Sequence, residues 1–312
     1  MPLRLLALAL ALSACASAPP APPASLDGPT LVVLGIAQDG GVPQTGDTNA
    51  PGWTDPDRRR RVVSLGLVDP TSGRRWLVEA TPDLPEQLAH LDRLAPRRGA
   101  ALDGVFLTHA HIGHYTGLMF LGHESLGARG VPVFAMPRMA DFLRTNGPWS
   151  QLVRFENVDL RELADGVPVP LADGLSVTPF LVPHRQEFSE VVGYRIDGPR
   201  QSALFVPDID SWREWDDAGT RLEDVLATVD VAYLDATFYD DGEIPGRDMS
   251  GFPHPLITTT MARLADLPAG ERAKVRLIHL NHTNPALWPG PAREAIEAAG
   301  MRVAEEGETV AI

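Results

Sequence analysis

Along the chain, short β-branched apolar runs alternate with longer stretches in which apolar residues recur every three or four positions. The short runs are typical of buried strands, and the longer stretches are typical of helices that cover a sheet. The predicted strands span residues 31–36, 62–68, 76–79, 105–107, 131–134, 175–182, 191–196, 203–206, 231–234 and 275–280. The predicted helices span residues 84–94, 115–126, 138–145, 221–229, 256–264 and 292–299. Strands with helices between them predict an α/β domain built of layers.

The N-terminal segment has a different pattern from the rest of the chain. Arg4 precedes an apolar stretch over residues 5–12. That stretch is too short for a bilayer, which needs about 20 residues, but it suits the core of a signal peptide. The sequence Leu-Ser-Ala-Cys that ends at Cys15 resembles the bacterial lipoprotein signal, in which this Cys becomes the lipid-bearing first residue.

We therefore expect a signal peptide over residues 1–14, a Pro/Ala-rich tether over 15–29 and one domain over 30–312. The predicted product is an exported bacterial lipoprotein at the periplasmic face of a membrane or at the cell surface, with the membrane as a partner through its lipid anchor. An ordinary secretory signal or a buried N-terminal helix is the alternative. The sequence indicates no oligomeric state.

Composition narrows the range of partners and metal ligands. The 312 residues carry 27 basic and 41 acidic side chains, a formal charge of −14. This negative field repels phosphate backbones, so nucleic acid is not expected as a partner. The expected partner is a small-molecule substrate. The single Cys excludes an internal disulfide framework and a Cys-rich zinc module. Histidines and carboxylates are therefore the candidate metal ligands.

The candidate chemistry concentrates where predicted strands end. After the strand at 105–107 the chain reads THAHIGH, which places His109, His111 and His114 within six residues. Two His residues two positions apart project from the same side of an extended chain, and the third can turn back toward them. His184, Asp208 and His279 each follow a later apolar run. Strands that converge at one sheet edge would bring these side chains together around one or two metal ions.

This order, His-x-His-x-x-His followed by His, Asp and His, resembles the metallo-β-lactamase superfamily, whose fold is a four-layer αββα sandwich. Further stretches are similar to the family of pyrroloquinoline quinone (PQQ) biosynthesis protein B. They are residues 40–44 (GGVPQ), 108–115 (THAHIGHY), 183–185 (PHR), 205–212 (FVPDIDSW), 235–239 (DATFY) and 278–285 (IHLNHTNP). The resemblance covers residues 31–311 and implies the αββα fold.

The resemblance also implies roles for individual residues. It assigns His109, His111 and His184 to one metal position. It assigns His114, Asp208 and His279 to a second, with Asp208 bridging the two. The resemblance implies one or two divalent ions, Zn²⁺ first, with Fe²⁺ and Mn²⁺ as alternatives, because His and carboxylate ligands suit all three.

Asp235 and His254 fall where the related RNase Z enzymes keep an acid–His pair for proton transfer. A carboxylate that accepts a hydrogen bond from an imidazole orients the ring and holds its pKa near the working pH. A buried structural hydrogen bond is the alternative for this pair. We also expect His282 to support the ligands and Tyr115 to stack against an aromatic substrate.

Two departures from the resemblance bear on function. Most hydrolases of the superfamily carry Asp immediately before the third His as a ligand of the second metal, whereas this chain has Gly113. That difference favours a single metal ion or a weak second one. The biosynthesis proteins also carry a Cys cluster for a structural zinc after the GGxPQ segment, whereas residues 45–53 contain no Cys.

The resulting prediction is an exported metal-dependent hydrolase that attacks an ester, amide or phosphoester of a small molecule with metal-activated water. The resemblance keeps two alternatives open. One is an iron-dependent oxygenase that hydroxylates a tyrosine-derived precursor in PQQ biosynthesis. The other is a non-catalytic, metal-holding protein that binds or transports a quinone or PQQ precursor.

Overall fold

The computed structural model describes residues 26–97 and 99–312. The predicted signal peptide, Cys15 and most of the predicted tether lie outside the described residues. None of the helices in the described part of the chain is both long enough and apolar enough to cross a membrane.

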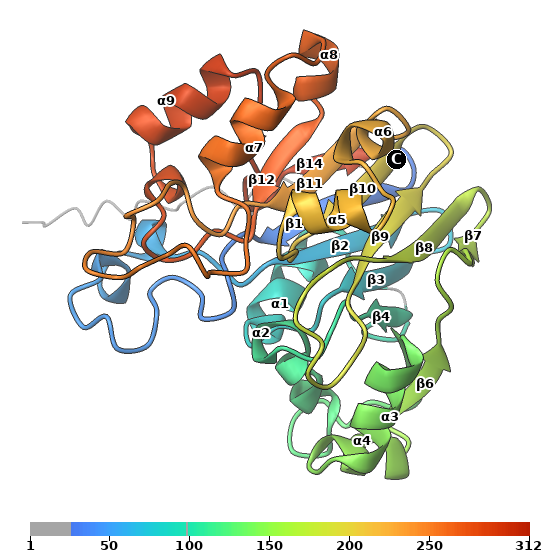
Figure 1. Ribbon diagram of the computed structural model, residues 1–312. Coiled ribbons are helices and arrows are strands. Elements are labelled where there is room, and N and C mark those ends of the chain that lie inside the picture. Colours follow the sequence, from blue (N-terminus) through green and yellow to red (C-terminus); the bar gives the residue numbers. More distant parts are fainter. Residues whose placement is uncertain (1–25, 98) are drawn as a thin grey trace, which may run out of the picture.

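Two seven-stranded mixed sheets form the centre of the molecule (Figure 1). The first sheet has the order β14-β1-β2-β3-β4-β5-β6. Its strands are β1 (Thr30–Gly35), β2 (Ser64–Asp69), β3 (Arg74–Val78), β4 (Gly104–Phe106), β5 (Val131–Ala135), β6 (Val158–Glu162) and β14 (Thr309–Ala311). The second sheet has the order β13-β12-β11-β10-β9-β8-β7. Its strands are β7 (Val169–Ala172), β8 (Leu175–Leu181), β9 (Val192–Asp197), β10 (Ser202–Val206), β11 (Val231–Asp235), β12 (Val275–Ile278) and β13 (Arg302–Val303).

Helices cover the outer face of each sheet. The helices on the side of the first sheet are α1 (Leu84–Leu94), α2 (Ile112–Tyr115), α3 (Pro137–Thr145) and α4 (Trp149–Arg154). The helices associated with the second sheet are α5 (Trp212–Asp217), α6 (Leu222–Leu226), α7 (Ile257–Leu264), α8 (Ala269–Arg272) and α9 (Pro291–Ala298). The expected αββα sandwich is therefore confirmed.

The alternation of side chains along β1 explains why both faces of the first sheet are buried. Leu31 and Val33 belong to the large core that lies between the sheets and under the second layer of helices. Val32 and Leu34 belong to a separate core beneath α1 and α3. Because successive side chains of a strand point to opposite faces, one apolar strand joins two cores.

The sheet topology brings several strand ends to one edge of the sandwich. In the first sheet β3 and β4 are parallel, and in the second sheet β10, β11 and β12 are parallel. The loops that follow β4, β8, β10 and β12 carry most of the candidate ligands. The carboxyl ends of parallel strands meet at the same edge of a sheet, so the topology brings residues that are distant in the sequence close together.

One predicted helix is wrong in extent. Residues 115–126 were expected to be helical, but α2 ends at Tyr115 and a 3₁₀ helix over Thr116–Leu121 follows. Gly117 and Gly122 lower the helix propensity of this stretch. The Cβ of any larger residue at position 117 would lie 2.0 Å from the carbonyl oxygen of Thr81, so close packing also dictates the local backbone.

A buried tyrosine links the two sheets next to the histidine cluster. The hydroxyl of Tyr194, on β9, donates a hydrogen bond to the carbonyl of Leu107 at 2.5 Å, immediately before Thr108 and His109. On β11, the hydroxyl of the fully buried Tyr233 has no hydrogen-bond partner among the described residues.

These two tyrosines make a matched test. Tyr194→Phe should lower the free energy of unfolding by about 1–3 kcal/mol, because it leaves a buried carbonyl without its donor. Tyr233→Phe should leave the free energy of unfolding nearly unchanged, since no bond is lost. Urea unfolding of the metal-free proteins measures the free energy of unfolding of each variant. Equal losses in the two variants would contradict the stabilising role of the Tyr194 hydrogen bond.

Candidate metal centre

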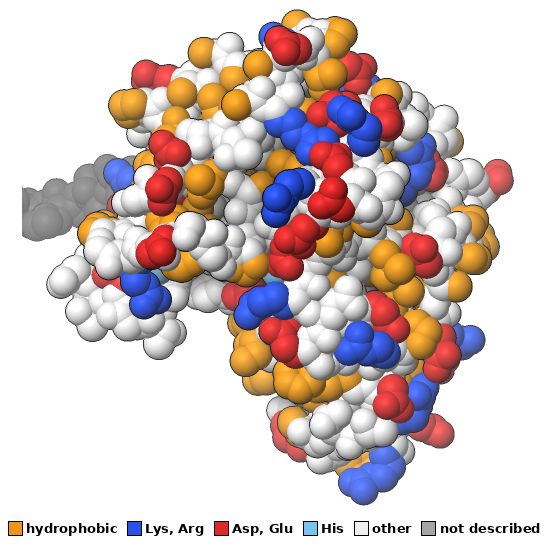
Figure 2. Space-filling model, viewed as in Figure 1, with side chains coloured by type: hydrophobic (Ala, Val, Ile, Leu, Met, Phe, Trp, Pro, Cys, Tyr) orange, Lys and Arg blue, Asp and Glu red, His pale blue; other side chains and the backbone are white. Residues whose placement is uncertain are grey.

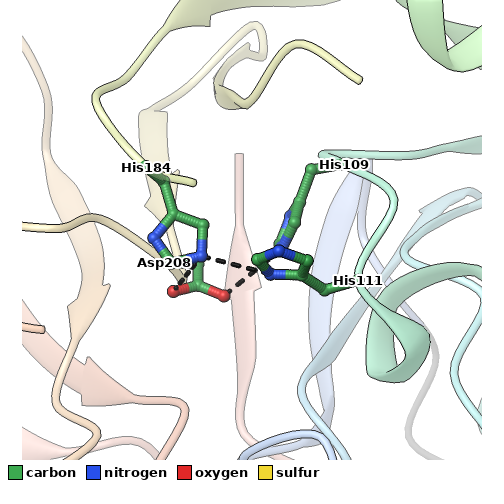
Figure 3. A group of neighbouring side chains, drawn as sticks. All are labelled: His109, His111, His184 and Asp208. Atoms are coloured by element: carbon green, nitrogen blue, oxygen red, sulfur yellow. Dashed lines mark hydrogen bonds and ion pairs between the residues drawn. The ribbon is translucent and has the colours of Figure 1, made fainter. Parts of the chain in front are cut away.

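The first ligand group gathers side chains from three loops at the shared edge. His109 and His111 follow β4, His184 follows β8 and Asp208 follows β10. Figure 3 shows their polar atoms pointing toward one another. His184 Nε2 lies 3.2 Å from both His111 Nδ1 and Asp208 Oδ1, and His109 Nε2 lies 3.4 Å from Asp208 Oδ2. One potential ligand atom from each residue lies within 4.8 Å of the others.

A second group shares Asp208 and adds His114, His279 and Asp39. His114 Nε2 lies 3.0 Å from Asp39 Oδ1 and 3.5 Å from Asp208 Oδ2. His279 Nε2 lies 3.4 Å from the same Asp39 oxygen and 3.9 Å from Asp208 Oδ2. Two imidazoles and two carboxylates therefore converge beside the first group.

The expected acid–His pair, Asp235 and His254, forms a third group with Asp208 and His279. His254 Nδ1 lies 2.8 Å from Asp235 Oδ2 and 3.3 Å from Asp208 Oδ1. The other oxygen of Asp235 accepts hydrogen bonds from the backbone and hydroxyl of Thr237. Asp235 is fully buried, so these donors hold its orientation.

Each metal-group imidazole has its second nitrogen held by a polar neighbour. The contacts are His109 Nδ1 with Thr108 Oγ1 at 2.8 Å, His111 Nε2 with Glu187 Oε2 at 3.0 Å, His114 Nδ1 with Glu79 Oε1 at 3.1 Å, His184 Nδ1 with Asp210 Oδ1 at 2.7 Å and His279 Nδ1 with Thr237 Oγ1 at 2.9 Å. Metal-binding histidines are generally oriented in this way, since the outer partner fixes the tautomer and the ring.

The electrostatics of the cluster separate its members. Burial lowers the pKa of His109 well below its ordinary value, which favours the neutral, ligand-competent ring. Burial opposes ionisation of Asp208, but His279 and the neighbouring imidazoles hold its pKa well below the usual range. Burial likewise opposes the charged form of His254, yet Asp235 and Asp208 raise its pKa to about 9.

Two buried atoms without a hydrogen bond indicate that the first group fits a cation. His109 Nε2 and Asp208 Oδ1 are buried, and neither forms a hydrogen bond to a described residue. Leaving such atoms unpaired in a protein interior costs about 1–3 kcal/mol each, more for a charged group. A divalent metal ion accepts lone pairs from imidazole nitrogen and carboxylate oxygen together, so these residues suit it.

Comparisons with known proteins assign this chain to a family. The family described as "Beta-lactamase superfamily domain" matches residues 74–280. The coenzyme PQQ synthesis protein B of Methylobacterium sp. (strain 4-46) is 31% identical over 90% of this chain and 99% of its own length. The chain belongs to the PQQ synthesis protein B family of the β-lactamase superfamily.

Solved structures agree on the fold. Zn²⁺-bound PqqB from Methylobacterium extorquens has a TM-score of 0.73 at 24% identity, covering 91% of this chain and 100% of that one. A diphosphatase of the PhnP family has a TM-score of 0.63 at 23% identity, covering 90% of this chain and 96% of that one. The likeness extends over nearly the whole described domain.

Two further residues, Tyr115 and His282, were expected to act beside the ligands. The ring of Tyr115 packs edge-on against Phe142 and Trp149 in the core beneath the first sheet. The expectation that Tyr115 stacks a substrate is therefore wrong, because α2 turns the side chain into the core. His282 belongs to none of the three ligand groups, and its buried Nδ1 has no hydrogen-bond partner among the described residues.

Sequence reasoning missed four carboxylates that complete the centre: Asp39, Glu79, Glu187 and Asp210. Each follows a strand or lies close to a predicted ligand, but acidic residues are too common in the chain for that position to stand out. In the structure, Glu79 is also distinguished by its backbone, which adopts a φ of 77°. Such a φ costs a non-glycine residue about 1–3 kcal/mol and clusters at functional sites.

A pocket of about 510 Å³ opens beside His254. Trp212, Phe252 and Pro255 give it apolar walls, while Asp210 and Arg213 place opposite charges on its lining. Across the face drawn in Figure 2, acidic and basic side chains are interspersed. The pocket therefore has the size and mixed character of a small-molecule site.

Metal binding should stabilise the fold measurably. Zn²⁺ at about 100 times its Kd should raise the free energy of unfolding of metal-free protein by about 2.7 kcal/mol. His109→Ala should lose most of this gain, because it removes a buried ligand. His123→Ala, at an exposed histidine outside the three groups, should keep it. Denaturant titrations with and without Zn²⁺ measure the gain; an unchanged response in His109→Ala would refute the ligand assignment.

Proposed function

We propose that the protein is an exported metal-dependent hydrolase, with Zn²⁺ as its first metal and an ester, amide or phosphoester of a small molecule as its substrate. The observation that carries the proposal is that two buried ligand atoms, His109 Nε2 and Asp208 Oδ1, form no hydrogen bond to a described residue and lie beside the Asp235–His254 pair. A divalent ion bound by these groups supplies a Lewis acid and lowers the pKa of bound water toward neutrality.

The side chains around the pocket support hydrolysis of a small substrate. His254 lines the pocket and its Nδ1 is bonded to Asp235, so Nε2 is the nitrogen that exchanges a proton with a bound molecule. With its pKa raised to about 9, the ring is protonated at neutral pH and donates a proton to a leaving group. The walls of Trp212 and Phe252 exclude water from an apolar portion of the substrate.

An iron-dependent oxygenase is the second candidate, because the relatives are named for PQQ synthesis and the imidazole–carboxylate donors also suit Fe²⁺. Metal analysis of protein from its own host, purified without chelators or metal-affinity columns, separates the candidates. Zinc or manganese supports the hydrolase. Iron with substrate-dependent oxygen uptake supports the oxygenase, and protein without metal would leave the ligand-binding or transport role.

His254→Ala tests the proton step. It should lower kcat on the best substrate of an ester, lactone and phosphodiester panel by about 10²–10⁴-fold. The wild-type kcat should fall as pH rises toward 9, where His254 loses its proton, and the variant should lack this decline. His123→Ala is the matched control. A variant that keeps both its kcat and the basic limb would exclude His254 as the acid.

Cys15→Ser tests the proposed lipid anchor. Removing the thiol that carries the lipid should move the protein from the membrane fraction to the soluble fraction of the host's cell envelope. Cell fractionation followed by mass spectrometry of the mature N-terminus measures this. An unmodified wild-type N-terminus, or equal membrane association of both proteins, would contradict the anchor.

A further inference from the structure

The second ligand group contains a carboxylate from an unexpected part of the chain. Position 113, where hydrolases that resemble this chain carry the Asp of the second metal, is Gly113. Asp39 lies instead on the segment that follows β1, 74 positions earlier in the chain (113 − 39). Its Oδ1 lies 3.0 Å from His114 Nε2 and 3.4 Å from His279 Nε2.

The imidazoles face Asp39 with their free nitrogens. His114 Nδ1 contacts Glu79 and His279 Nδ1 contacts Thr237, so both rings present Nε2 to Asp39 and Asp208. Two imidazole nitrogens and two carboxylate oxygens make a complete set of four ligands for a tetrahedral cation. The arrangement uses no atom from position 113.

Gly113 is required by the position of Asp39. An ideal Cβ at position 113 would lie 2.5 Å from Asp39 Cα and 2.6 Å from its Cγ and Oδ1. Real Cβ atoms do not approach a backbone carbon this closely, so a side chain at 113 would displace the segment that carries Asp39. The position of Asp39 therefore depends on the absence of a side chain at position 113.

The segment is fixed to the strand end that carries His279. Gln38 N donates to the carbonyl of Leu280 at 2.8 Å, and Leu280 N donates to the carbonyl of Ile36 at 2.9 Å. The side chain of Asn281 also donates to Gln38 Oε1. These bonds flank Asp39 and hold it against His279, so the carboxylate is in position before a metal ion binds.

We propose that Asp39 supplies the carboxylate that position 113 lacks, and that Asp39, His114, Asp208 and His279 hold a second divalent metal ion. The inference rests on the proposed metal-dependent function. It adds that the chain holds two ions despite Gly113 and that Asp39 is a ligand of the second ion only.

Metal content of reconstituted protein tests this directly. Metal-free wild type is loaded with Zn²⁺, dialysed and measured by mass spectrometry, and a parallel Co²⁺ titration follows the absorption of each site. Wild type should hold two ions per chain. Asp39→Ala should hold one, and its Co²⁺ titration should lose one phase. His111→Ala should also hold one, because it removes a ligand of the other group.

Two controls keep the result interpretable. Asp47→Asn changes an exposed carboxylate of the same segment and should retain two ions. Asp39→Asn preserves shape in case the Ala variant fails to fold, and thermal melts of the metal-free proteins check folding. Two ions bound with wild-type affinity in both Asp39 variants would overturn the inference. One ion in wild type, lost in His111→Ala and kept in Asp39→Ala, would overturn it and leave the hydrolase proposal intact; no ion in wild type would overturn both.

Gly113→Ala gives an independent test through packing. Its added Cβ should displace Asp39 and release the second ion while the first stays bound. Gly270→Ala is the matched control, because an added Cβ there meets nothing within 4 Å. Two ions retained in Gly113→Ala would contradict the link between the two positions.

Discussion

The buried carboxylate of Asp208 is the constraint on which the candidate centre depends. It is 4% exposed and belongs to all three ligand groups, facing imidazoles from both sheets. An ionised carboxylate in a protein interior must be paired, because its desolvation costs several kcal/mol. The strand ends of β4, β8, β10 and β12 therefore have to meet closely enough for their histidines to surround it. At the same edge, the hydroxyl of Tyr194 links β9 to the residue that follows β4.

Polar groups behind the ligands fix the orientation of the ligand side chains. Buried Glu79 contacts both Thr108 and His114, so one carboxylate orients the two ends of the histidine cluster. Thr237 performs the corresponding task for Asp235 and His279 on the second sheet. Glu79 and His279 adopt positive φ values, 77° and 66°, which their neighbours must hold in place. Local strain of this kind is tolerated where the surrounding packing over-determines the backbone. The backbone strain lies at residues that bind or orient the ligands, which is consistent with a preorganised centre.

The sequence predicted features that depend on local pattern or on a shared order of motifs. The apolar runs located most central strands, and the order of His109, His111, His114, His184, Asp208 and His279 indicated both the family and the ligands that the fold brings together. The edge strand β6 (VDLRE) escaped prediction because charged residues interrupt its apolar ones. The edge strand β7 (VPLA) escaped it because its apolar run is short and contains a proline. Tyr115 was misjudged because its neighbour His114 faces the centre while the turn of α2 sends its own ring into the core. Asp39 could not be found from spacing, since its role arises from a contact with His114, 75 positions away.

That contact shows how a metal site can keep its chemistry while its sequence motif changes. A carboxylate at position 113 would reach the cluster from the histidine loop, whereas Asp39 reaches it from the loop after β1. The two routes exclude each other sterically, because the backbone of Asp39 occupies the space beside Gly113. The missing Asp of the motif is therefore better interpreted as a change in which loop supplies the ligand than as the loss of a site. A glycine within a ligand motif is informative for this reason: it marks a place where another segment approaches, and that segment is where a replacement ligand should be sought.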